Sequence, residues 1–307
     1  EGAIKIDDLQ EYSKSNKIKS LGLCDTSNLC GALEFAEKIS KSGTQPIIGT
    51  QINLKIFDTI GLLPLYALNE IGYKNIIDIS SVSYLKNDEL SDPHVTFDYL
   101  LNNSEGIALF SGTVFGLFGK LFDKGKFTEI QDLYKKIKSI FGDRFYIEIQ
   151  RHRDLNENSF EKFNLKRSSD LEIPIIATNE VYYLNQDMYE AHDALICIGN
   201  KTYVNDKNRL KYSDQHYLKN NSEMSELFTD LPEALENNYN FPLRCNFRPL
   251  FSNPILPNIS KDKGGNADNI LRKDSLDGLK TKFKKVFNIQ TNDIETNQSY
   301  LDYNHYR

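Results

Sequence analysis

The sequence predicts an α/β fold. Short apolar runs rich in Ile, Val, Tyr and Phe recur between longer amphipathic stretches. This alternation is typical of βαβ units rather than of a β-sandwich or a helical bundle. The 307 residues, of which 39% are hydrophobic and 26% charged, suit one large α/β domain with an appendage, or two domains.

The expected strands are short apolar runs in the first 177 residues, too brief for helices of usual length. They are 20–23, 46–54, 62–66, 107–111, 145–150 and 173–177. The amphipathic stretches between them predict helices at 7–15, 31–42, 69–84, 96–101, 127–141 and 159–170.

The helix at 31–42 illustrates the reasoning. Leu33, Phe35, Ala36 and Ile39 place most of their apolar surface on one helical face. Gly43 follows as a C-terminal cap, because glycine adopts the left-handed conformation that ends many helices.

After residue 177 the pattern becomes mainly helical. Helices are expected at 187–198, 223–228, 234–239 and 267–287. Residues 241–266 carry prolines and the pair Gly264-Gly265, a composition typical of linkers. The sequence therefore predicts a main domain over 1–240, a linker over 241–266 and a further segment over 267–307, whose polar end from 288 is expected to be poorly ordered.

Several protein classes are excluded by composition. No run approaches the roughly 18 apolar residues that span a bilayer, and the first residues do not resemble a secretory signal. The net charge of −6, without a basic run, speaks against a free-standing nucleic-acid-binding surface. The four cysteines contain no C-x-x-C pair and are expected to be reduced and mostly buried. We expect a cytoplasmic protein. A chain that opens on Glu1 is expected to be processed or, more simply, a fragment.

Motif spacing alone assigns no chemistry. The closest two of the five histidines are 24 positions apart, so no local metal motif exists. The glycines around Gly112 lack the register of a phosphate loop, and Ser111 lacks that of a nucleophile elbow. Asp25 and Glu180 each follow an expected strand, where α/β folds keep functional side chains. They could serve acid–base chemistry, although Asp25 could equally cap a helix.

Several blocks of sequence, in a fixed order, resemble the N-terminal PHP domain of the bacterial DNA polymerase III alpha subunit. The resemblance covers about residues 1–285 and is carried by 21–35, 43–51, 68–75, 146–152, 175–184, 191–195, 227–235 and 244–246. It implies a distorted (β/α) barrel of the PHP type, followed by a short helical and linker segment that leads toward the polymerase palm, of which 267–307 would be the truncated start.

Active members of that family bind metal ions through a cluster of His, Asp, Glu and Cys, and this chain departs from the cluster almost everywhere. Its paired histidines would lie before Glu1, which stands where the family has Asp. Of the remaining ligand positions, Asp25 is kept, and the others read Thr26 for His, Gln51 for Glu, Leu62 for His, Thr113 for Cys, Glu180 for Asp and Tyr182 for His. Because most of these groups bind divalent metals weakly or not at all, we expect a degenerate cleft without metal.

The resemblance also implies a role. This chain would be a catalytically silent scaffold that docks the proofreading exonuclease subunit and contacts other replicase subunits. It would contain no catalytic residue, and DNA, nucleotides and the polymerase Mg²⁺ would be bound by domains downstream. No membrane contact is expected.

Two alternatives stay open. A metal-dependent PHP phosphoesterase is favoured by the barrel and Asp25 but opposed by the missing ligands. A stand-alone binding protein has no sequence feature behind it. His152, which also follows a strand, is expected to be an ordinary residue and not a ligand.

Overall fold

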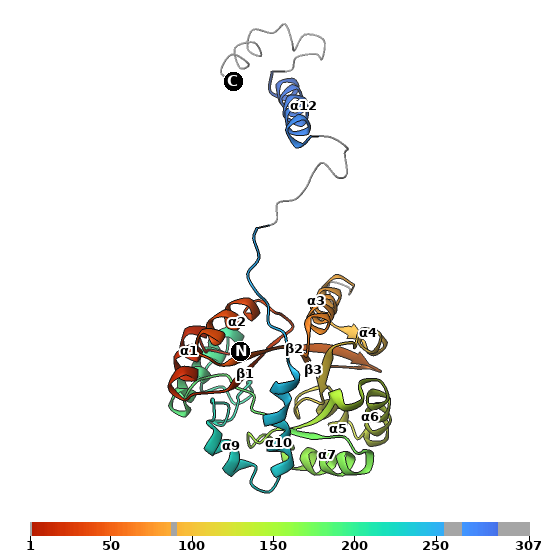
Figure 1. Cartoon of the computed structure of the whole chain (residues 1–307), viewed down its shortest axis with the longest axis vertical. Helices are drawn as coiled ribbons and strands as arrows, with labels where there is room; N and C mark the ends of the chain where they lie inside the picture. The colour runs from red at the N-terminus through yellow and green to blue at the C-terminus, as the bar shows by residue number, and fades with distance from the viewer. Residues whose placement is uncertain (1, 87–90, 255–265, 288–307) are drawn as a thin grey trace. The chain divides into compact units, whose positions relative to one another are not determined.

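The fold is taken from a computed structural model, which describes residues 2–86, 91–254 and 266–287 (Figure 1). The chain divides into two compact units, Glu1–Phe251 and Ser252–Arg307. The expected linker over 241–266 therefore begins inside the first unit, and its residues 255–265 lie outside the described ones. The polar end from 288 also lies outside the described residues.

The first unit is built on one seven-stranded sheet. Its strands are β1 (Ser20–Thr26), β2 (Gln45–Ile56), β3 (Thr59–Ala67), β4 (Val95–Thr96), β5 (Ile107–Phe110), β6 (Phe145–Ile149) and β7 (Ile175–Ala177). The order is β1-β2-β3-β5-β6-β7, with β4 paired to β2. All six expected strands are present, and the mixed α/β fold with a curled sheet confirms the distorted barrel.

The sheet is not built from βαβ units alone. β1 pairs with β2 in parallel, as do β5 with β6 and β6 with β7. β3, however, runs antiparallel to both of its neighbours, β2 and β5. The βαβ pattern expected from the sequence does not extend to this part of the sheet, because β2 and β3 form a hairpin across a two-residue turn in which Phe57 has a φ of 55°.

The helices surround the sheet (Figure 1). In the first half they are α1 (Ile6–Ser15), α2 (Ala32–Lys41), α3 (Glu70–Leu85), α4 (Phe97–Asn102), α5 (Leu117–Asp123), α6 (Phe127–Phe141) and the 3₁₀ turn η1 (Gly142–Arg144). Then follow α7 (Glu157–Leu171), η2 (Gln186–Met188), α8 (Tyr189–Asn200), α9 (Asn221–Leu227), α10 (Pro232–Asn240) and η3 (Phe241–Arg244). The bounds of the α-helices agree with the expected ones to within a few residues, except that α5 was not expected. The short strand β4 was not expected either.

The two faces of the sheet carry different apolar clusters, because side chains alternate along a strand. Ile52 and Leu63 belong to the larger cluster, which packs under helices. Phe110 and Tyr146 belong to a smaller cluster on the other face. There the ring of Phe241 lies 5.0 Å from that of Phe110. This packing places the start of the expected linker within the first unit.

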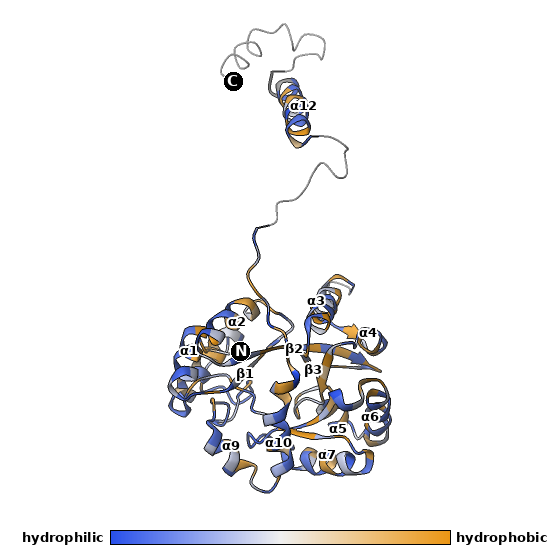
Figure 2. Ribbon diagram, in the orientation of Figure 1, coloured by the Kyte–Doolittle hydropathy of each residue, from blue (hydrophilic) through white to orange (hydrophobic). Residues whose placement is uncertain are grey.

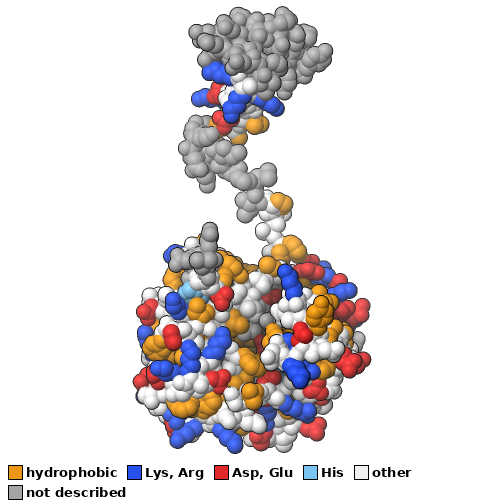
Figure 3. All heavy atoms as spheres, turned by 180° about the vertical axis from the view of Figure 1, so that it is seen from behind, with side chains coloured by type: hydrophobic (Ala, Val, Ile, Leu, Met, Phe, Trp, Pro, Cys, Tyr) orange, Lys and Arg blue, Asp and Glu red, His pale blue; other side chains and the backbone are white. Residues whose placement is uncertain are grey.

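The surface is mixed in character. Figure 2 shows helices that carry both polar and apolar residues around strands that are richer in apolar ones, and Figure 3 shows acidic and basic side chains interspersed over one face. None of the helices within the described part of the chain is long and apolar enough to cross a membrane.

The second unit contains one described helix, α12 (Ala267–Phe287). Its bounds are those expected from the sequence. Asp268 lies in its first turn and Lys284 and Lys285 in its last, where opposite partial charges of the helix favour them.

Candidate functional site

The ends of β1 and β2 bring together three of the residues expected in the degenerate cleft. The parallel register sets Asp25 beside Thr50 and Thr26 beside Gln51. Burial raises the pKa of the Asp25 carboxyl above its usual value. Thr26 is exposed at the strand end, and Glu1 lies outside the described residues.

Glu180 joins this group from the segment after β7, the strand at the other end of the sheet order from β1. The Gln51 amide donates a hydrogen bond from Nε2 to Glu180 Oε1 at 3.0 Å, across a sequence separation of 129 residues. Asp25 and Glu180 are the two described carboxylates among the expected ligand positions. The Glu180 carboxylate therefore accepts a hydrogen bond from a neutral amide.

Leu62 and Thr113 lie on neighbouring segments. A Cβ on Gly116 would be 3.0 Å from the Leu62 carbonyl oxygen, so the loop 112–116 packs directly against β3. The Thr113 hydroxyl accepts a hydrogen bond from the Phe115 amide at 3.1 Å. The Thr113 hydroxyl therefore stabilises the turn that contains it. The Leu62 side chain has no atom that could bind a metal ion.

Tyr182 lies in an aromatic cluster. Its ring is 4.9 Å from that of His216 and 4.5 Å from that of Tyr212. Its amide donates to the His216 carbonyl oxygen at 2.9 Å. The phenol is thus held by packing with residues from the segment between α8 and α9.

Sequence reasoning missed Glu148 as part of the site. This carboxyl is buried on β6, where it accepts hydrogen bonds from the Gly112 amide at 3.1 Å and from Gln150 Nε2 at 3.0 Å, and also from the Thr178 hydroxyl. Burial raises its pKa to about 7, opposed by these hydrogen bonds and reinforced by the charge of Glu180. The sequence did contain a signal for this residue, since Glu148 is the single charged residue in the otherwise apolar strand Phe145–Ile149.

Cys24 belongs to the same interior. Burial raises the pKa of its thiol, and nearby Glu148 and Glu180 add to the effect. A thiol held protonated is a poor nucleophile and metal ligand. Tyr66 lies alongside, in space that a side chain on Gly49 would occupy, since a Cβ there would be 2.6 Å from Tyr66 Cδ1. The four cysteines are free, as expected. Cys197 and Cys245 are buried, whereas Cys24 is half-buried and Cys30 is exposed, so only two of the four fit the expected burial.

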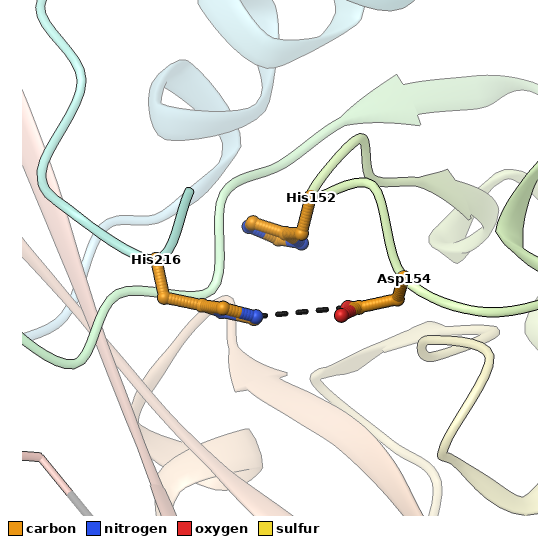
Figure 4. A group of neighbouring side chains, drawn as sticks. All are labelled: His152, Asp154 and His216. Atoms are coloured by element: carbon orange, nitrogen blue, oxygen red, sulfur yellow. Dashed lines mark ion pairs between the residues drawn. The ribbon is translucent and has the colours of Figure 1, made fainter. Parts of the chain in front are cut away.

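A second group, outside the expected cleft residues, has the composition of a metal site. Potential ligand atoms of His152, Asp154 and His216 all lie within 4.8 Å of one another (Figure 4). His216 Nε2 is 3.6 Å from Asp154 Oδ2, and the two imidazole rings stack with centroids 4.1 Å apart. No local spacing in the sequence signals this group, because His216 comes from a distant segment.

The comparisons with known proteins agree on one family. Residues 1–152 match the PHP domain. The DNA polymerase III alpha subunit of Caulobacter vibrioides is 36% identical over 292 residues, which cover 92% of this chain and 26% of that protein. The same subunit of Rickettsia felis is 37% identical, covering 92% of this chain and 24% of that protein.

A more distant relative extends the match. The DNA polymerase III alpha subunit of Pseudomonas aeruginosa is 30% identical over 307 residues, which cover 98% of this chain and 26% of that protein. The chain thus spans about a quarter of the length of the curated relatives it matches.

Proposed function

The chain carries a PHP domain and is related over most of its length to bacterial DNA polymerase III alpha subunits, and we propose that it serves DNA replication as a catalytically silent scaffold within such a subunit. The parent protein would polymerise DNA with Mg²⁺, and would bind DNA and nucleotides, through domains beyond this chain. In that role the protein would work in the cytoplasm with the other subunits of the replicase.

The observation that carries the silent role is the hydrogen bond from Gln51 Nε2 to Glu180 Oε1. A second carboxylate at position 51 would complete a pair of oxygen ligands, whereas an amide nitrogen donor satisfies Glu180 without any cation. Thr113 accepts a hydrogen bond within a local turn, and Tyr182 packs against aromatic rings. These contacts support a cleft that is stable without metal.

The silent role predicts no metal-dependent hydrolysis. We expect the full chain, incubated with Mn²⁺ or Zn²⁺ and an aryl phosphate, to turn over substrate no faster than the double variant Asp25→Asn/Glu180→Gln. Hydrolysis that requires added metal and disappears in the double variant would contradict the silent role. It would support the phosphoesterase alternative instead.

The scaffold role predicts a partner. We expect the full chain to form a one-to-one complex with the proofreading exonuclease subunit of the same bacterium, at roughly 10 μM of each protein, a concentration above the Kd of most interfaces of standard size. Size-exclusion chromatography with light scattering measures the mass of the complex. The double variant Asp25→Asn/Glu180→Gln, altered only in the cleft, should bind equally well. Two separate peaks for the wild-type mixture would refute the docking role.

A further inference from the structure

His152, Asp154 and His216 lie where two loops meet. His152 and Asp154 belong to the loop after β6, and His216 belongs to the segment between α8 and α9. Both imidazoles are almost fully buried, with exposed fractions of 2% and 1%. Figure 4 shows the Asp154 carboxylate directed toward His216.

The tautomer of His152 follows from its neighbour. Asn179 donates from Nδ2 to the Tyr217 carbonyl oxygen at 2.9 Å, which leaves Asn179 Oδ1 as the acceptor. His152 Nε2 lies 3.0 Å from that Oδ1 and must therefore carry the proton. The lone pair of His152 is then on Nδ1.

His216 is arranged in the same way. Its Nδ1 lies 3.1 Å from the backbone carbonyl oxygen of Glu180, which can only accept, so Nδ1 carries the proton. Its Nε2 is buried and has no hydrogen-bond partner. An imidazole whose far nitrogen donates to a carbonyl group is the usual arrangement of a metal-binding histidine.

The space in front of these lone pairs is acidic. Asp154 is 11% exposed, and Glu157 Oε1 lies 3.9 Å from His152 Nδ1. Asp154, Glu157 and Glu161 also line a small pocket of about 20 Å³, to whose lining neither histidine contributes. The Glu157 oxygens accept hydrogen bonds from the His152 and Arg153 amides at 2.7 and 2.8 Å. The His216 Nε2 lone pair, however, faces the Asp154 carboxylate with no proton or cation between them, which is unfavourable in a buried place.

Two cationic groups oppose a metal here. The Lys219 ammonium donates to Asn179 Oδ1 at 3.3 Å and to the Gln215 carbonyl oxygen, and Arg153 lies in the same loop as the ligands. Lys219 is separated from the lone pairs by the Asn179 amide and the His152 ring. The Asp154 and Glu157 carboxylates lie on the lone-pair side, 3.6 Å from His216 Nε2 and 3.9 Å from His152 Nδ1 respectively, where they would attract a cation.

We propose that His152, Asp154 and His216 bind a divalent transition metal ion, with Zn²⁺ the best match for two imidazoles and one carboxylate. Tetrahedral binding requires the ligand atoms to approach to about 3.3 Å of one another. It also requires the two rings, which now stack with an angle of 8° between their planes, to turn until both in-plane lone pairs point at one ion. A water molecule would complete the coordination. The ion would tie the loop after β6 to the segment before α9, a structural role separate from the degenerate cleft.

The test is Zn²⁺ binding by the full chain. After removal of metal with a chelator and dialysis against Zn²⁺, we expect one equivalent of zinc in the wild type. Isothermal titration should show affinity reduced at least about 100-fold by His216→Gln and at least about 10-fold by Asp154→Asn. Wild type without bound zinc, or either variant with unchanged affinity, would overturn the proposal.

Two controls locate the ion and guard against misfolding. The double variant Asp25→Asn/Glu180→Gln should keep its zinc, and loss of zinc there would place the ion in the degenerate cleft and overturn the proposal. Co²⁺ added to the metal-free wild type should give visible absorption bands of tetrahedral coordination by nitrogen and oxygen. Bands typical of an octahedral aqua ion would also overturn it, whatever the folding of the variants.

Discussion

Replacing Gly72 by alanine is expected to lower the free energy of unfolding by about 3 kcal/mol or more. Gly72 lies in the first turn of α3, where a Cβ would be 1.9 Å from the Gly106 carbonyl oxygen and 2.4 Å from the Gly106 carbonyl carbon. Both atoms are backbone, and the same carbonyl accepts a hydrogen bond from the Leu68 amide at 2.9 Å. The contact can therefore be relieved only by moving the helix away from the start of β5.

Gly199→Ala is the matched control for that variant. Gly199 lies in α8, and no heavy atom is within 4 Å of the position of its Cβ. Alanine there should stabilise the helix by at most about 1 kcal/mol, its ordinary advantage over glycine. Urea denaturation followed by circular dichroism measures both changes. If the free energy of unfolding of Gly72→Ala is within about 1 kcal/mol of that of the wild type, α3 does not lie as close to Gly106 as described.

Glu148→Gln is expected to change how the stability of the protein depends on pH. Because burial raises the pKa of Glu148 to about 7, the folded state binds its proton more tightly than the unfolded chain, where the pKa is about 4.3. This contribution is fully present below about pH 4.3 and is lost as the pH rises to about 7, a change on the order of 4 kcal/mol. Wild type should thus lose stability, relative to the variant, between these values.

The glutamine side chain is suited to this comparison. It keeps an oxygen that can accept from the Gly112 amide, and its amide nitrogen can donate to Gln150 Oε1, which has no partner, once the Gln150 amide turns over. The exposed variant Glu236→Gln is the control and should leave the pH profile of wild type unchanged. Parallel profiles for wild type and Glu148→Gln between pH 4.5 and 8 would show that Glu148 does not titrate in this range.

Local patterns were sufficient for most elements. Phe35, Ala36 and Ile39 on one helical face are all buried in α2, and Gly43 has the positive φ of 77° expected of its capping position. Such elements are set by interactions between residues a few positions apart, which the sequence contains directly.

Two features that depend on how backbone segments approach and pair in the fold were not predicted. α5 contains Gly119 and follows a loop with two further glycines, a composition that indicates a turn. In the fold Gly119 is required, because a Cβ there would be 1.8 Å from the Val114 carbonyl oxygen. The antiparallel β2–β3 hairpin likewise depends on pairing, which the spacing of apolar runs does not specify.

For the site, the sequence by itself determined the chemistry of the side chains: the amide of Gln51, the phenol of Tyr182 and the family these residues point to. Only the tertiary structure decided which groups meet. The Gln51–Glu180 hydrogen bond, the raised pKa of Glu148 and the approach of His216 to His152 and Asp154 all join segments far apart in the chain. The physical reason is that burial and contact between distant segments arise from packing of the whole sheet and its loops, whereas the periodicity of a sequence reports only its local partners.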